Sequence, residues 1–178
     1  MGLIQRSGSH TQEASTLVLG LGNELAGDDA VGILVARQVR AIADAEVDVV
    51  ESSASGLALI EIFAGYERAI VVDSIFTGRD APGSIREMGM EEVGRVVAPS
   101  VHQAGLPELA AVAARLGLKF PSCTHVFAVE VADPYTLGAP LSEAVSASIP
   151  ELTHRVRDLL VCWALQEEPC TTTTPSAR

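Results

Sequence analysis

Short hydrophobic runs that alternate with segments of helical spacing constrain the fold of this 178-residue chain more than any other feature. Four of these runs have the length of strands, at 16–19, 47–50, 69–72 and 126–131. Long hydrophobic strands with few polar positions are typical of a parallel sheet that is buried on both faces. We therefore predict the α/β class, with a single three-layer domain built on a mostly parallel, twisted sheet with helices on both faces.

The segments between these runs carry helix signals. After the first strand, Asp28 has the position and side chain of an N-cap. One apolar face then follows at helical spacing, made of Val31, Leu34, Val35, Val39 and Ile42. A short helix is expected at 56–64, and a turn at 80–83 should lead into a short strand at 84–88.

Two longer helices are expected in the second half of the chain. Residues 100–103 have the spacing of a capping box, and Pro107 should lie in the first turn of the helix behind it. Leu109, Val112 and Leu116 line one face of that helix. The last helix has an apolar stripe of Val145, Ile149, Leu152, Val156, Leu159 and Trp163, and Pro150 should kink or restart it.

The two ends of the chain differ in composition from the middle. Residues 1–15 are polar, and 166–178 contain a threonine-rich run without periodicity. We expect both to be disordered tails, and we expect the folded domain at 16–165.

Composition excludes several classes of function. The net charge of −11 argues against a nucleic-acid backbone or an anionic membrane as a partner. The hydrophobic runs are too short for a transmembrane helix, and the first 15 residues lack the apolar stretch of a secretory signal. The three cysteines show no CxxC spacing, so a cytoplasmic location is expected.

Three side chains fall where strands end or helices begin. Asp29 follows the first strand, Asp73 closes the third, and His102 opens a helix. The carboxyl ends of the strands in an open α/β sheet line one shared crevice, so these side chains should converge there. Two carboxylates and a neutral imidazole would balance the charge of a divalent ion such as nickel or zinc, and would leave positions open for water or substrate.

Each candidate residue also has a structural interpretation. Asp29 could favour the helix dipole, Asp73 could cap a turn, and His102 could be a solvated first-turn residue. Their joint placement at one sheet edge favours the metal site. His125 at a strand start is expected to be structural, and the serines at 52, 53 and 55 are expected to form a turn rather than supply a nucleophile.

Two other functions are compatible with the pattern. Gly20-Leu21-Gly22 after the first strand, with Glu51 ending the second, is similar to the fingerprint of a nucleotide-binding oxidoreductase. However, Leu25 occupies the third glycine position, and Asp28 and Asp29 would repel a pyrophosphate at the helix N-terminus. The other alternative is a non-catalytic nickel chaperone of the same fold.

Several motifs, taken in order, resemble one known family. They are Val18 to Asn23 with Asp28 to Gly32, then Val72-Asp73, Ala81 to Gly83, His102 to Leu106, and Gly138 with Leu141-Ser142. In this order and spacing the chain, from about Thr16 to Trp163, resembles the hydrogenase maturation endopeptidases (peptidase family M52). These enzymes remove the C-terminal extension of the large-subunit precursor of nickel–iron hydrogenases.

The resemblance implies roles for individual residues. Asp29, Asp73 and His102 match the family's metal-binding positions, which are also its catalytic residues. The metal is implied to be the nickel already inserted in the precursor, a recognition element for which other divalent ions can substitute. One departure is the loop Glu51–Gly56, where the family often has a sequence like Asp-Gly-Gly-Thr. This loop borders the expected crevice, so the fit of the substrate should differ there.

Overall fold

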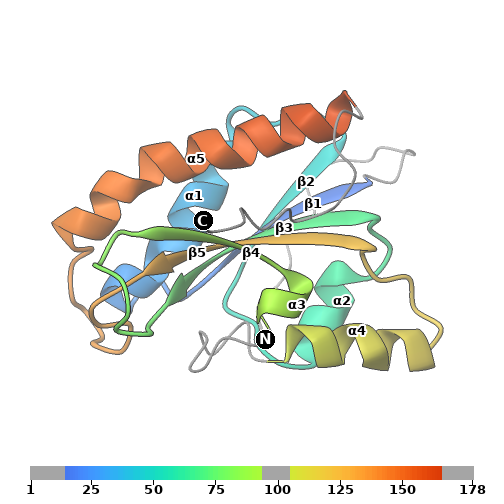
Figure 1. The fold of residues 1–178 in the computed structure, drawn as a ribbon, viewed down its shortest axis with the longest axis horizontal. Coiled ribbons are helices and arrows are strands. Elements are labelled where there is room, and N and C mark those ends of the chain that lie inside the picture. Colours follow the sequence, from blue (N-terminus) through green and yellow to red (C-terminus); the bar gives the residue numbers. More distant parts are fainter. Residues whose placement is uncertain (1–14, 94–104, 166–178) are drawn as a thin grey trace, which may run out of the picture.

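The computed structural model describes residues 15–93 and 105–165 of the chain. The strands are β1 (Thr16–Leu21), β2 (Val47–Ser52), β3 (Arg68–Ile75), β4 (Ile85–Gly89) and β5 (Cys123–Glu130) (Figure 1). The helices are the short 3-10 helix η1 (Gly27–Ala30), α1 (Val31–Arg40), α2 (Ala58–Phe63), α3 (Met90–Val93), α4 (Leu106–Arg115) and α5 (Glu143–Ala164). The expected tails lie outside the described residues, apart from Ser15.

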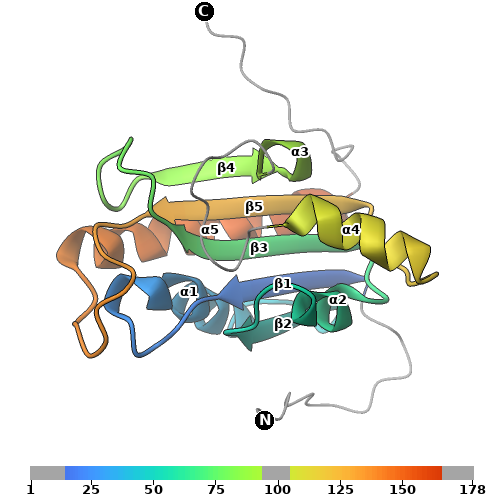
Figure 2. The ribbon, with the colours of Figure 1, turned by 90° about the horizontal axis from the view of Figure 1, so that it is seen from below.

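The strands form one sheet in the order β2-β1-β3-β5-β4. The pairs β1–β2, β1–β3 and β3–β5 are parallel, whereas β4 runs antiparallel to β5. In Figure 2 the arrowheads of β1 and β5 point to one end of the molecule and that of β4 to the other. The predicted fold class is confirmed, and the carboxyl ends of four parallel strands meet at one edge.

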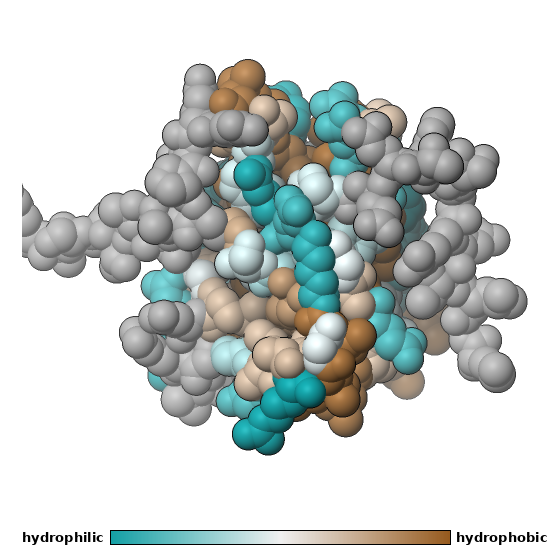
Figure 3. Space-filling model, turned by 90° about the vertical axis from the view of Figure 1, so that its right-hand side faces the viewer, coloured by the Kyte–Doolittle hydropathy of each residue, from teal (hydrophilic) through white to brown (hydrophobic). Residues whose placement is uncertain are grey.

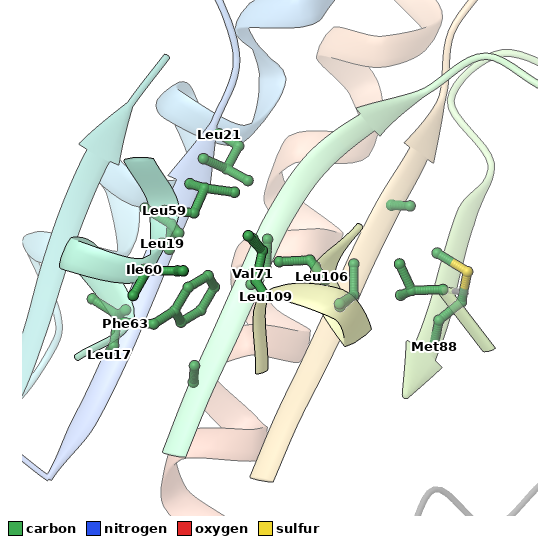
Figure 4. Close-up of a cluster of buried hydrophobic side chains, with 14 of the residues drawn as sticks. Leu17, Leu19, Leu21, Leu59, Ile60, Phe63, Val71, Met88, Leu106 and Leu109 are labelled. Carbon is green, nitrogen blue, oxygen red and sulfur yellow. The ribbon is translucent and has the colours of Figure 1, made fainter. Parts of the chain in front are cut away.

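Helices cover both faces of the sheet. In Figure 1, α1 and α5 lie on one face and α2, α3 and α4 on the other. Neighbouring side chains of a strand point to opposite faces, so each face has its own hydrophobic core. In Figure 4, Leu17, Leu19 and Leu21 of β1 lie beside residues of α2, and Val71 of β3 lies beside residues of α4. Val18 belongs to the core on the other face. Burial on both faces explains the continuous hydrophobic runs.

The strand and turn predictions hold with small shifts in their ends. β3 continues to Ile75, so Asp73 lies inside the strand, paired with Ala128, and does not close it. The sequence pattern ended the strand at the first polar residue after the apolar run. Asp73 is polar but buried inside β3, so the strand continues past it. Among the described helices, none is long and apolar enough to cross a membrane.

Two helix ends were predicted wrongly, and so was a restart of the last helix. Ile42 and Leu116 follow the ends of α1 and α4 and are exposed, because an apolar residue at the surface extends a pattern as well as a buried one does. α5 is one helix from Glu143 to Ala164 and does not restart at Pro150. Ile149 and Leu152, on either side of the proline, are both buried, and this packing supports the helix across the missing N–H.

Glycines allow α1 to begin directly on the strand ends. A Cβ at Gly32 would lie 2.2 Å from the carbonyl oxygen of Leu21 in β1 and 2.3 Å from that of Val72 in β3. A Cβ at Gly20 would lie 2.2 Å from the carbonyl oxygen of Gly32. No side chain fits at these contacts, so the glycines set how closely the helix approaches the sheet.

This contact predicts a large loss of stability for Gly32→Ala, of at least about 3 kcal/mol, because backbone must move to admit the methyl group. The control is Gly117→Ala, where φ is +68° and the space is open. It should cost only the strain of a left-handed residue, about 1–2 kcal/mol. Chemical denaturation of both variants measures the difference. Equal losses would show that the close approach does not limit the fold.

Candidate functional site

The two neighbouring acids after β1 lie in η1, at the carboxyl edge of the sheet. Gly22 has a φ of +148°, and a Cβ there would be 1.9 Å from the carbonyl oxygen of Asp29. Because Gly22 has no Cβ, the backbone of η1 can pack closely against the end of β1. Asp28 and Asp29 are each only 5% exposed. Buried carboxylates require hydrogen bonds or positive charge, so their partners indicate what each residue does.

Asp28 holds the start of α5, and the prediction that it caps α1 is wrong. It lies inside η1, whose own cap makes no side-chain hydrogen bond. Its Oδ1 accepts a hydrogen bond of 2.7 Å from the backbone N–H of Ser142, the N-cap residue of α5. The partner lies 114 residues away in sequence, and no local pattern could have shown it.

Asp29 and Asp73 are connected through Ser74. The hydroxyl of Ser74 donates to Oδ1 of Asp29 at 2.5 Å, and its backbone N–H donates to Oδ1 of Asp73 at 2.8 Å. Asp73 and Ser74 are buried in β3. The structure therefore links two of the three predicted site residues through one serine, which the sequence analysis did not single out.

The third predicted residue, His102, lies outside the described residues. Within 15–93 and 105–165, no group of three or more histidine, cysteine, aspartate or glutamate side chains could hold a metal ion. The predicted part of His102 in a metal site therefore stays a prediction. The donor set of Asp29, Asp73 and an imidazole suits a borderline divalent ion.

An open hollow of about 340 Å³ lies beside the end of β1. Its walls include Gly22, Glu24, Glu51 and the loop residues Ser52 and Ser53. The hydroxyl of Ser52 accepts a hydrogen bond from the backbone N–H two residues later, which confirms the predicted turn. This is the loop in which the sequence departs from the family pattern.

The acids of this hollow are engaged by α1. The carboxylate of Glu51 pairs with Arg37, at 2.8 Å, and with Arg40. Arg37 also contacts Glu24 at 2.5 Å, and this hydrogen bond lowers the pKa of the Glu24 carboxyl below its ordinary value. Arg37 and Arg40 thus pair with the carboxylate of Glu51, the group that would bind a ribose in a nucleotide-binding protein.

Glu130 is a buried acid at the same edge that sequence reasoning missed. Its carboxylate accepts hydrogen bonds of 2.6–2.7 Å from the hydroxyl and backbone N–H of Thr77 and from the N–H of Gly78. It fixes the loop that follows β3. An acid within the hydrophobic run 126–131 was the available signal, because a charge in such a strand needs dedicated partners.

His125 lies at the opposite end of the sheet, among structural contacts. It is buried near the start of β5, 3.2 Å from a carboxylate oxygen of Glu87, and its ring packs edge-on against Trp163. Figure 3 shows this end of the molecule, where hydrophobic and hydrophilic side chains intermix. The prediction that this histidine is structural agrees with its place.

The model of the family described as "Hydrogenase maturation protease" matches residues 33–158. The chain belongs to this family. The match includes Asp73 and His102 and begins just after Asp29. One relative is the Hydrogenase 2 maturation protease of Escherichia coli strain K12, with 30% identity over 72% of this chain and 82% of the relative. Another is the Hydrogenase expression/formation protein HupD of Bradyrhizobium diazoefficiens, with 29% identity over 87% of this chain and 82% of the relative.

The fold agrees with this assignment. The solved structure of the hydrogenase maturating endopeptidase HybD from Escherichia coli superposes with a TM-score of 0.71 and 26% identity, over 82% of this chain and 91% of that one. The protein is therefore a hydrogenase maturation protease, an endopeptidase that cleaves at the C-terminus of a hydrogenase large subunit. The oxidoreductase alternative is set aside.

The contact of Asp28 predicts that Asp28→Ala lowers the free energy of unfolding by about 1–3 kcal/mol, because the N–H of Ser142 loses its acceptor. Asp28→Asn keeps an acceptor oxygen and should lose less. The control is Asp133→Ala, which removes an exposed carboxylate that bonds the N–H groups of Tyr135 and Thr136. It should cost less than Asp28→Ala in thermal or denaturant unfolding. A neutral Asp28→Ala would contradict the structural role.

Proposed function

We propose that this protein removes the C-terminal extension from the large-subunit precursor of a nickel–iron hydrogenase, and that the nickel of the precursor is the element it recognises. The observation that carries the proposal is the pair of buried carboxylates, Asp29 and Asp73, linked at the carboxyl edge of the sheet in a chain of this family. Cytoplasmic location, which the sequence favoured, is part of the proposal.

The proposed metal ligands are Asp29, Asp73 and His102. Two carboxylates and a neutral imidazole would balance a divalent charge, and oxygen and nitrogen ligands suit nickel while allowing other divalent ions to take its place. Since the metal arrives with the substrate, it leaves with the product. An exchangeable set without thiolates fits this use, because a protease that kept the nickel would strip the hydrogenase.

The same three residues are the proposed catalytic group. Hydrolysis requires an activated water and a polarised carbonyl, and the nickel could supply either effect. Transfer of a proton from the water to the departing amine requires a base, which one of the two carboxylates can provide. The domain that performs this chemistry is proposed to span 16–165.

The central test compares two forms of a purified precursor, with and without inserted nickel. Wild-type enzyme should cleave the loaded form and ignore the nickel-free form. Asp73→Asn keeps the shape but leaves an amide that coordinates metal poorly, and His102→Ala removes the nitrogen ligand. Both variants should fold and should fail to release the C-terminal peptide, as measured by mass spectrometry.

Three outcomes would contradict this proposal. Equal cleavage of the nickel-free precursor would exclude nickel as the recognition element. Full activity of Asp73→Asn would remove the carboxylate from the site. Binding of loaded precursor without any cleavage would support the nickel-chaperone alternative.

An exposed apolar rim lies at the same edge of the sheet. It consists of Leu25, Phe76, Tyr135 and Leu137, from the loops that follow β1, β3 and β5. Leu25, Tyr135 and Leu137 are 69%, 68% and 70% exposed, and the rings of Phe76 and Tyr135 pack edge-on. Exposed apolar groups that gather beside a site are typical of docking surfaces.

The loop that carries two rim residues is anchored rather than loose. The carboxylate of Asp133 accepts hydrogen bonds from the N–H groups of Tyr135 and Thr136, and the N–H of Gly138 donates to the carbonyl oxygen of Leu25 at 2.7 Å. The fold thus holds apolar side chains in water at the proposed site. A protein substrate, the precursor, would cover them.

The rim predicts that the double variant Tyr135→Ser, Leu137→Ser raises KM for the nickel-loaded precursor about tenfold with little change in kcat. The matched control is Leu116→Ser, which alters an equally exposed leucine at the C-terminal end of α4. Steady-state kinetics should show no change for the control. The same KM for both variants would mean that the precursor does not contact the rim.

A further inference from the structure

We infer that Ser74 is a positioning residue for the hydrogenase-processing site, which fixes the carboxylate of Asp29 relative to Asp73. This inference rests on the proposed function of these two acids. It concerns a side chain that acts through them and is not itself proposed to touch the nickel.

Ser74 connects two elements that the sequence places far apart. Its hydroxyl reaches from β3 to Oδ1 of Asp29 in η1, 45 residues earlier in the chain, while its own N–H holds Oδ1 of Asp73. One residue thus makes a direct hydrogen bond to each of two of the three proposed ligands. The short path fixes where the two carboxylates lie relative to each other.

The backbone around Ser74 explains why its hydroxyl points at η1. Val72, two residues earlier, belongs to the core on the α1 side of the sheet, and side chains two apart on a strand share a face. Gly32 lets the start of α1 touch the carbonyl of Val72, so η1 lies next to this face of β3. The hydroxyl of Ser74 therefore meets the acid that η1 carries.

Burial makes this hydrogen bond strong and directional. Ser74 is 1% exposed and Asp29 is 5% exposed, so little water is present to replace either partner. The oxygen–oxygen distance of 2.5 Å is typical of a hydroxyl that donates to an ionised carboxylate. A hydroxyl has one proton, and Ser74 donates it to Asp29, so this hydrogen bond restricts the orientation of the carboxylate.

Burial deprives each carboxylate of the water that would otherwise solvate its charge. Each hydrogen bond from Ser74 offsets part of this cost and opposes rotation of the carboxylate away from the position the metal needs. Groups that orient metal ligands in this way typically contribute 10- to 100-fold to metal affinity or activity. We expect the same range for Ser74.

The experiment compares five enzymes: wild type, Ser74→Ala, Ser74→Thr, Asp29→Asn and a matched control. The control is Ser148→Ala, which removes another buried serine hydroxyl, one that donates to the carbonyl oxygen of Val145 inside α5. For each enzyme, the affinity for nickel-loaded and nickel-free precursor is measured over times shorter than one turnover. The kcat for the loaded form and the thermal midpoint are measured as well.

Ser74→Ala should lower the affinity for the nickel-loaded precursor, or the kcat for its cleavage, by 10- to 100-fold relative to wild type. Its affinity for the nickel-free precursor should equal that of wild type. Ser74→Thr keeps the hydroxyl and should restore most of the loss. Ser148→Ala should retain the wild-type nickel dependence whatever it does to the thermal midpoint. A defect of folding alone would lower binding of both precursor forms equally.

The outcomes separate this inference from the proposed function. If Asp29→Asn loses the nickel dependence while Ser74→Ala keeps it, the positioning role of Ser74 is wrong and the site stands. Loss in Ser74→Ala that a folded Ser74→Thr does not restore also overturns the role of the hydroxyl. If wild type shows no nickel dependence, or Asp29→Asn keeps it, the proposed function itself fails.

Discussion

The close contact between the beginning of α1 and the ends of β1 and β3 is the constraint on which the site depends. Gly20 and Gly32 permit it, because a Cβ at either would lie 2.2 Å from a backbone oxygen. Gly22 continues the contact into η1. Without this approach, η1 would lie further from β3, and the hydroxyl of Ser74 could not reach Asp29. Residues that carry no functional group therefore determine where the acids lie.

The two adjacent acids of η1 have different partners, so one has a structural role and the other belongs to the proposed site. Asp28 turns toward α5 and holds the N–H of Ser142, whereas Asp29 faces β3. A 3-10 helix has three residues per turn, so neighbouring side chains point in directions about a third of a turn apart. The division lets one acid secure the last helix while the other serves the proposed metal site.

The sequence predicted the sheet well and the local contacts poorly. Strands buried on both faces leave continuous apolar runs that are visible without a structure, and their shared edge already brought Asp29 and Asp73 into one hypothesis. The roles of Asp28, Ser74 and Glu130 depend on partners 114, 45 and about 50 residues away, and no local pattern records such pairs. The position of His102 lies outside the described residues and stays a prediction.

X-ray absorption at the nickel edge tests the central claim most directly, since it reports the atoms bound to the metal. The spectrum of nickel-loaded precursor alone would be compared with that of its complex with the enzyme, trapped before cleavage. The account predicts that nickel gains oxygen and nitrogen ligands at about 2 Å in the complex, and that the Asp73→Asn enzyme does not supply the full set. Nickel surroundings that stay unchanged on binding of wild-type enzyme would contradict a metal held by Asp29, Asp73 and His102.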